Sequence, residues 1–341
     1  MRYLTKEQLL LELRRRPGLV PVAIEIQRRQ LEWLDLETYH FYEGFFHKGI
    51  DNFAALKRAR TGRLVESFIT SVDVLDDQQI LVDSIYPSGF IFHAGRCGST
   101  LLTRILARDR RHLVIGEAPA HNQVWLELTN NGEVALRATE KNKQVYKHLL
   151  LAMGRKRLPV HEAHFIKFTS FNILFFNFIR DVFPDVPALF LYREPLDILA
   201  SYEKNPPGWF ASKQEPFRRF LTKIAMDGGE PKAGCDSAAA AVTAFFVAGL
   251  RAGESGARYL HYTELSSAKL PSILRALNVS STKSQLSAMQ SQFGYDSKVD
   301  HRATRFVANA QPPDTPAIEE RSREILEQLY DQLVQSDSNV P

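Results

Sequence analysis

The stretch from Gly89 to Leu106, GFIFHAGRCGSTLLTRIL, decides the fold that the sequence predicts. Its apolar run over 90–92 is typical of a buried strand, and apolar residues after position 100 recur at helical spacing. A turn with two glycines and two hydroxyl residues separates the strand from the helix. The N–H groups of such a turn, together with the positive end of the following helix, form a binding site for a phosphate-like anion.

The turn supplies several groups that suit an anionic ligand. Arg96 carries a fixed charge that can form two parallel hydrogen bonds to anionic oxygens. Hydroxyls stand at the start of the helix. We therefore predict that an anion is bound by six consecutive residues: Gly95, Arg96, Cys97, Gly98, Ser99 and Thr100.

Two other phosphate chemistries match the turn less well. A nucleoside triphosphatase loop has four residues between its glycines and then Lys-Ser/Thr, whereas Gly95 and Gly98 are closer together and Ser99 replaces the lysine. A cysteine-dependent phosphatase would use Cys97 as nucleophile. That class separates its Cys and Arg by five residues, but six residues separate Cys97 from Arg104. A turn without any ligand also stays open.

A second strand and helix carry another candidate phosphate site. The apolar run 188–192 leads into Arg193, and Pro195 is typical of the first turn of a helix. Ser201 lies eight residues after Arg193, within that helix. A guanidinium at a strand end and a hydroxyl two turns along can bind one phosphate. The alternative is that Arg193 only caps the strand.

Together the two motifs resemble those of the sulfotransferase family. Residues 95–102, GRCGSTLL, resemble its 5′-phosphosulfate loop, in the arginine-containing form of tyrosylprotein and bacterial sulfotransferases, and Arg193 with Ser201 resembles its 3′-phosphate motif. The resemblance implies the donor 3′-phosphoadenosine 5′-phosphosulfate (PAPS) and an acceptor that is a small molecule, peptide or carbohydrate, without a metal. Tyr262, in a stretch similar to one that ends a late strand in relatives, joins the nucleotide-binding set.

The resemblance also implies catalytic roles. Glu117 lies as far from the loop arginine as the catalytic base of tyrosylprotein sulfotransferases, and Lys167 lies where related enzymes carry a lysine that stabilises the leaving oxygen. Arg96 completes the predicted catalytic set. From position alone, Glu117 is equally a helix cap or turn residue, and Lys167 equally a surface side chain with a buried stem. No residue is assigned from the basic stretch 293–306, where relatives close a loop over the 3′-phosphate.

Composition narrows the class of protein. The 341 residues carry a net charge of +4, which suits an anionic ligand but is too weak to indicate nucleic acid. Two cysteines give no disulfide framework, and no Cys/His cluster has metal-ligand spacing. The charged N-terminus and the lack of a run of about 18 apolar residues predict neither a signal peptide nor a membrane span. We expect a cytoplasmic protein, and no oligomeric state is indicated.

Candidate strands alternate with helical segments along the chain, at 89–93, 112–116, 164–168, 187–192 and 258–262. This pattern predicts a three-layer αβα fold with a mostly parallel central sheet, and its ligand should lie at the carboxyl ends of the strands. We expect a mainly helical N-terminal extension (1–80), an α/β domain (81–310), and a linker with a C-terminal helix (311–341). In the extension, 22–33 is predicted to be helical, and an aromatic patch at 39–46 is either core or acceptor pocket.

The predicted function is transfer of a sulfuryl group from PAPS to a hydroxyl or amine. One alternative is an ATP-dependent kinase or P-loop NTPase with an altered loop, against which the missing lysine and the Arg193–Ser201 pair argue. Another is a nucleotide-binding protein without catalysis, against which Glu117 and Lys167 argue.

Overall fold

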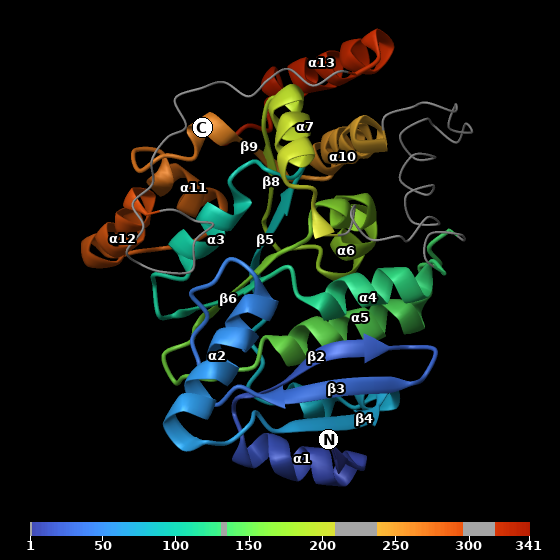
Figure 1. The fold of residues 1–341 in the computed structure, drawn as a ribbon, viewed down its shortest axis with the longest axis vertical. Coiled ribbons are helices and arrows are strands. Elements are labelled where there is room, and N and C mark those ends of the chain that lie inside the picture. Colours follow the sequence, from blue (N-terminus) through green and yellow to red (C-terminus); the bar gives the residue numbers. More distant parts are fainter. Residues whose placement is uncertain (1, 131–134, 209–236, 296–317) are drawn as a thin grey trace.

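The computed structural model describes residues 2–130, 135–208, 237–295 and 318–341. Its centre is a five-stranded sheet in which every neighbouring pair of strands is parallel (Figure 1). The strand order is β6 (His112–Gly116), β7 (Ala163–Lys167), β5 (Pro87–His93), β8 (Ala188–Tyr192) and β9 (Arg258–His261). The predicted strands and the parallel sheet are confirmed, with strand ends moved by at most two residues.

Helices cover both faces of this sheet. One face packs against α3 (Ser99–Leu106), α11 (Leu270–Ala276) and α12 (Lys283–Gln290). The other packs against α4 (Pro119–Leu128), α5 (Glu140–Met153), η3 (Ser170–Phe175), α6 (Phe176–Val182) and α10 (Ser237–Glu254). The predicted three-layer fold is confirmed.

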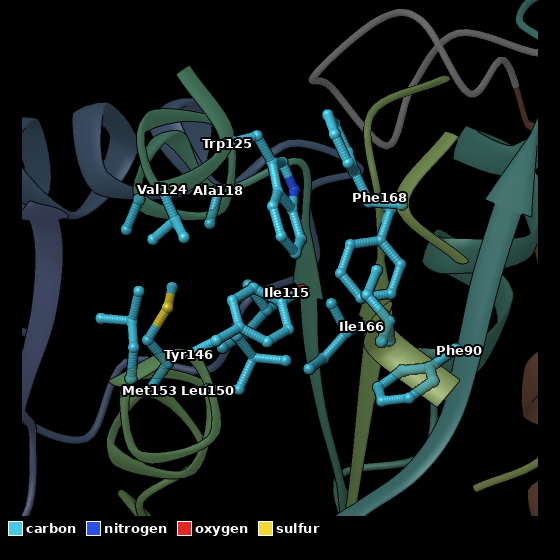
Figure 2. Close-up of a cluster of buried hydrophobic side chains, with 14 of the residues drawn as sticks. Phe90, Ile115, Ala118, Val124, Trp125, Tyr146, Leu150, Met153, Ile166 and Phe168 are labelled. Carbon is cyan, nitrogen blue, oxygen red and sulfur yellow. The ribbon is translucent and has the colours of Figure 1, made fainter. Parts of the chain in front are cut away.

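Side chains of each central strand alternate between the two apolar layers, because successive residues of a strand point to opposite faces. Ile91 lies in the layer of α3, whereas Phe90 and Phe92 lie in the layer of α4 and α5. Figure 2 shows the second layer, where Trp125 of α4 and Tyr146 of α5 point toward the strands. With both faces buried, the strands read as continuous apolar runs, which is why the sequence reveals them.

The N-terminal extension corrects the prediction of a mainly helical segment. It contains a second sheet with the order β1 (Arg2–Tyr3), β4 (Ser67–Ser71), β3 (Gln30–Asp35) and β2 (Leu19–Glu25). Around this sheet lie α1 (Lys6–Arg15), α2 (Phe46–Thr61), η1 (Val72–Asp76) and η2 (Gln78–Leu81).

The helix expected over 22–33 is wrong, since β2 and β3 form an antiparallel hairpin there. In β3 the buried residues alternate strictly, with Leu31 and Trp33 facing the core. This period of two, together with β-branched residues in β2, outweighs the weaker helical spacing.

The N-terminal sheet is fixed to the central domain through β2, which packs on α4 and α5. Arg155 is buried after α5 and donates hydrogen bonds to the carbonyls of Leu13 (2.8 Å), Leu19 (3.0 Å) and Val82 (3.1 Å). The segment between β3 and α2 runs past the end of β6, where a side chain on Gly116 would lie 2.3 Å from the Gly44 carbonyl oxygen. The extension therefore reaches the carboxyl ends of the central strands.

The C-terminal part completes the domain. Helix α7 (Pro195–Lys204) follows β8, and α13 (Glu320–Val334) packs against both α10 and α7. The short helices η4 (Tyr262–Glu264) and η5 (Ser291–Gly294) follow β9 and α12. Helix α13 lies within the predicted C-terminal segment, and the linker predicted before it lies outside the described residues.

Candidate active site

The loop between β5 and α3 has the backbone conformation of an anion-binding turn. Gly95, Arg96 and Gly98 have φ angles of 93°, 53° and 82°, and such left-handed residues turn successive N–H groups toward one point. A side chain at Gly95 would lie 2.1 Å from the Tyr202 hydroxyl oxygen, and one at Gly98 would lie 2.8 Å from Leu265. Both glycines are therefore required by conformation and by space, and the loop residues fit a bound phosphate-like group.

Cys97 turns its side chain away from the loop and into the core. Its thiol is buried and donates to the Leu191 carbonyl oxygen at 3.1 Å. Burial raises the pKa of the thiol to about 12, so it is protonated at neutral pH. A phosphatase nucleophile must be a thiolate, which contradicts that alternative. What Cys97 offers a ligand is its backbone.

The two predicted phosphate motifs lie side by side, and Tyr262 contacts both. A side chain on Gly98 would lie 3.2 Å from the Tyr262 ring, while the Arg193 guanidinium carbon lies 4.5 Å from the centre of the same ring. Helix α7 also touches the first loop, since the Tyr202 hydroxyl donates to the Ala94 carbonyl at 3.4 Å. The adjacency of β5 and β8 in the sheet brings the motifs together.

Arg193 directly follows β8, and an ion pair with Asp197 fixes its side chain. Its Nε and Nη2 donate to Asp197 Oδ2 at 3.0 and 2.7 Å, and the side chain stays partly exposed. Ser201 lies two turns further along α7 and is also partly exposed. An anion from solvent can therefore reach this second motif.

Arg96 points from the loop toward the end of α7. Its Nη2 donates to the Asn205 carbonyl oxygen, and its guanidinium carbon lies 5.9 Å from the centre of the Tyr202 ring. The Nε–H is buried and has no hydrogen-bond partner among the described residues. Arg96 therefore has one N–H donor that is unsatisfied among the described residues.

The buried Lys167 and the partly buried Glu117 form an ion pair beside the loop. Lys167 is fully buried at the end of β7, and its Nζ lies 2.6 Å from Glu117 Oε1. The same ammonium donates to Thr100 Oγ1 at 3.2 Å and to the Gly44 carbonyl at 3.1 Å, and it lies 4.3 Å from the centre of the Phe45 ring. A buried cation thus connects the anion loop to the candidate base.

The backbone holds Glu117 in an unusual conformation. Its φ is 50°, and its N–H donates to the Lys167 carbonyl oxygen at 2.7 Å. It does not cap α4, whose N-cap is Ala118, and Lys167 is not a surface side chain. The helix-cap alternative for Glu117 and the surface alternative for Lys167 are therefore wrong, whereas Glu117 does lie in the bend that follows β6. The two side chains come together, and their catalytic roles stay predictions.

The charge on Glu117 follows from these neighbours. Burial by itself would raise the pKa of the carboxyl, but the nearby Lys167 ammonium and then His93 outweigh that effect and lower the pKa to about 2. Glu117 is therefore ionised at neutral pH, as a proton acceptor must be. Glu117 is a weak base while the Lys167 ammonium remains paired with its carboxylate.

Sequence reasoning missed three residues of this site. His93, the last residue of β5, accepts a hydrogen bond from the Gly95 N–H at its Nδ1 (3.0 Å). Gly44 and Phe45 contact Lys167, as described above. The available signals were the position of His93 directly before the loop and the aromatic patch at 39–46, whose Phe41 and Phe46 are buried.

Three further points concern the basic C-terminal stretch, metal binding and membrane spans. Most of the basic stretch at 293–306 lies outside the described residues. Within the described parts of the chain, no group of three or more His, Cys, Asp or Glu side chains converges as a metal site. No helix in those parts combines the length and apolarity that crossing a membrane requires.

No family model and no curated protein matches the sequence. The solved structures that are similar to the chain include the following three. The sulfotransferase STF9 from Mycobacterium avium is 16% identical, with a TM-score of 0.45 over 86% of both chains. The mouse sulfotransferase SULT7A1, complexed with PAP, is 9% identical, with a TM-score of 0.38 over 79% of this chain and 92% of that chain. Retinol dehydratase in complex with androsterone and the inactive cofactor PAP is 12% identical, with a TM-score of 0.30 over 83% and 93%.

The ion pair predicts a distinctive pattern of stability losses. Lys167→Met should lower the free energy of unfolding by about 3–5 kcal/mol, because the partly buried Glu117 carboxylate is left without its cation. The double variant K167M/E117Q should lose clearly less than K167M alone, since it leaves no charge unpaired. Urea unfolding at pH 7 measures these differences.

Lys156, an exposed lysine, provides the matched control. Lys156→Met should stay within about 0.5 kcal/mol of the wild type. If K167M is no less stable than K156M, or if the double variant loses as much as K167M, then Glu117 and Lys167 are not coupled as described.

Proposed function

We propose that this chain is a sulfotransferase that moves a sulfuryl group from PAPS to a hydroxyl or amine of an acceptor. The observation that carries the proposal is the position of Lys167. Its buried ammonium lies between Thr100 of the anion loop and the carboxylate of Glu117. A group bound in the loop would therefore meet a cation and a proton acceptor at the same place.

The two anion sites suit the two charged ends of PAPS. The loop of residues 95–100 would hold the 5′-phosphosulfate through its N–H groups, the Arg96 Nε–H and the start of α3. Arg193, with Ser201 along α7, would hold the 3′-phosphate. Tyr262 lies between the sites, in contact with Gly98 and Arg193. ATP has no 3′-phosphate and would leave the second site unused.

The proposed reaction is a single displacement at sulfur. A bond forms between the acceptor oxygen or nitrogen and sulfur, and the bond between sulfur and the bridging phosphate oxygen breaks, with PAP as the leaving product. Glu117 takes the proton that the acceptor loses. The developing negative charge on the leaving oxygen is stabilised by Lys167 and by the N–H groups of the loop.

Lys167 would link these two tasks. In the structure its ammonium holds the pKa of Glu117 low. As negative charge develops on the leaving oxygen, the ammonium is drawn toward it and away from Glu117. The carboxylate then becomes more basic when the acceptor proton must be taken up.

Two other functions compete with this proposal. An ATP-dependent kinase would need the loop lysine that Ser99 replaces. A binding protein without catalysis would have no use for a buried Lys167 and a Glu117 in a left-handed conformation, because both cost stability.

The second anion site can be tested by nucleotide binding. Arg193→Ala should weaken PAP binding about 10- to 100-fold, because a charge-assisted contact to phosphate is worth roughly 1.5–3 kcal/mol. Isothermal titration calorimetry measures the affinity. Lys204→Ala, which removes an exposed cation from the same helix, should leave the affinity within about 2-fold. Equal affinities of R193A and K204A would remove Arg193 from the donor site.

The base assignment can be tested by turnover. Glu117→Gln should bind PAP about as tightly as the wild type but release labelled sulfuryl groups from PAPS at least about 100-fold more slowly. The rate at which label leaves the nucleotide measures this turnover, whichever acceptor is used. The exposed Glu203 gives the control variant E203Q, which should turn over normally. Normal turnover by E117Q would exclude Glu117 as the base.

A further inference from the structure

His93 lies between the anion loop and Glu117 and has a possible partner at each ring nitrogen. It is the last residue of β5, its side chain is buried, and its Nδ1 accepts the Gly95 N–H at 3.0 Å. Its Nε2 lies 3.5 Å from Glu117 Oε1. Nε2 is buried and makes no hydrogen bond of its own among the described residues, so Glu117 is the carboxylate it faces.

These contacts decide which nitrogen carries the proton. An N–H group at Gly95 can bond to Nδ1 only if that nitrogen has a free lone pair. A neutral ring then carries its proton on Nε2, the nitrogen that faces Glu117. Burial is the main cause that lowers the pKa of His93; Glu117 and the Phe168 backbone oppose it, and Lys167 acts with it.

We propose that His93 is a positioning residue that holds the first N–H of the anion loop through Nδ1 and orients the Glu117 carboxylate through Nε2–H. This inference rests on the proposed sulfotransferase function. It extends that function by assigning a residue outside both predicted motifs. The ring would act on the reaction through Gly95 and Glu117, without contacting the donor or the acceptor itself.

The positioning role of His93 follows from the unusual backbone conformations of Gly95 and Glu117, which need contacts to fix them. Gly95 has a φ of 93° and Glu117 a φ of 50°, and such conformations persist only where surrounding contacts fix them. Lys167 and His93 both face Glu117 Oε1, at 2.6 and 3.5 Å. When Lys167 moves toward a leaving oxygen, the Nε2–H of His93 can still donate to the Glu117 carboxylate and so maintain its orientation. The contact of 3.5 Å is long for a hydrogen bond, and catalytic hydrogen bonds often tighten only in the substrate complex.

Two substitutions distinguish the contributions of the two ring nitrogens. In His93→Asn the side-chain oxygen can replace Nδ1 as acceptor for the Gly95 N–H, but nothing replaces Nε2. In His93→Gln the amide reaches the position of Nε2, and the acceptor for Gly95 is lost. We expect H93N to keep its PAP affinity within about 3-fold and H93Q to bind PAP at least 10-fold more weakly. A histidine that only fills space would give both variants similar losses.

The tautomer is read directly by nitrogen NMR of protein labelled on its histidine rings, with H93N identifying the His93 signals by difference. We expect Nδ1 to be unprotonated and Nε2 to carry the proton, and Glu117→Gln should shift the Nε2 resonance while leaving Nδ1 nearly unchanged. The assignment would be overturned by a protonated Nδ1, by an Nε2 resonance that does not shift in E117Q, or by equal PAP affinities of H93N and H93Q. A wild-type protein that does not bind PAP would instead overturn the proposed function on which the inference rests.

Discussion

The buried ammonium of Lys167 is the constraint on which the site depends. A lysine without solvent needs a charge partner and acceptors for its hydrogens, and the fold supplies these from three separate parts of the chain. Glu117 comes from the end of β6, Thr100 from the start of α3, and the Gly44 carbonyl from the N-terminal extension. Holding one cation therefore fixes the anion loop, the candidate base and the extension relative to one another.

The parallel sheet makes this convergence possible. Because β5, β6, β7 and β8 run in the same direction, their carboxyl ends meet at one edge, where a ligand binds in open α/β sheets. Each strand ends at a residue of the site or directly before one: His93, Glu117, Lys167 and Arg193. Left-handed backbone at Gly95, Arg96, Gly98 and Glu117 then turns the chain sharply away from the sheet. In this way the strand order, more than any single motif, explains why the two anion sites and the ion pair are neighbours.

The central domain could be predicted from sequence because each of its strands is buried on both faces and reads as an apolar run. The residues at the strand ends were predictable for the same reason, and Glu117 and Lys167 do meet. The β2–β3 hairpin was missed because its strict alternation covers only the six residues of β3, and a helical spacing was read over 22–33 instead. His93, Gly44 and Phe45 were missed because their roles depend on contacts between segments distant in sequence. The roles of Arg96, Ser99, Thr100, Arg193, Ser201 and Tyr262 toward a nucleotide stay predictions.

The most direct test of the central claim, that the site binds a 3′-phosphorylated nucleotide, is thermal unfolding of the whole chain with PAP, ATP or AMP. At 100 times its dissociation constant, a ligand that binds only the folded state adds about 2.7 kcal/mol of stability. We expect a clear rise of Tm with PAP, and little change at the same concentration of ATP or AMP. Stabilisation by ATP in preference to PAP, or no response to any of the three, would contradict it.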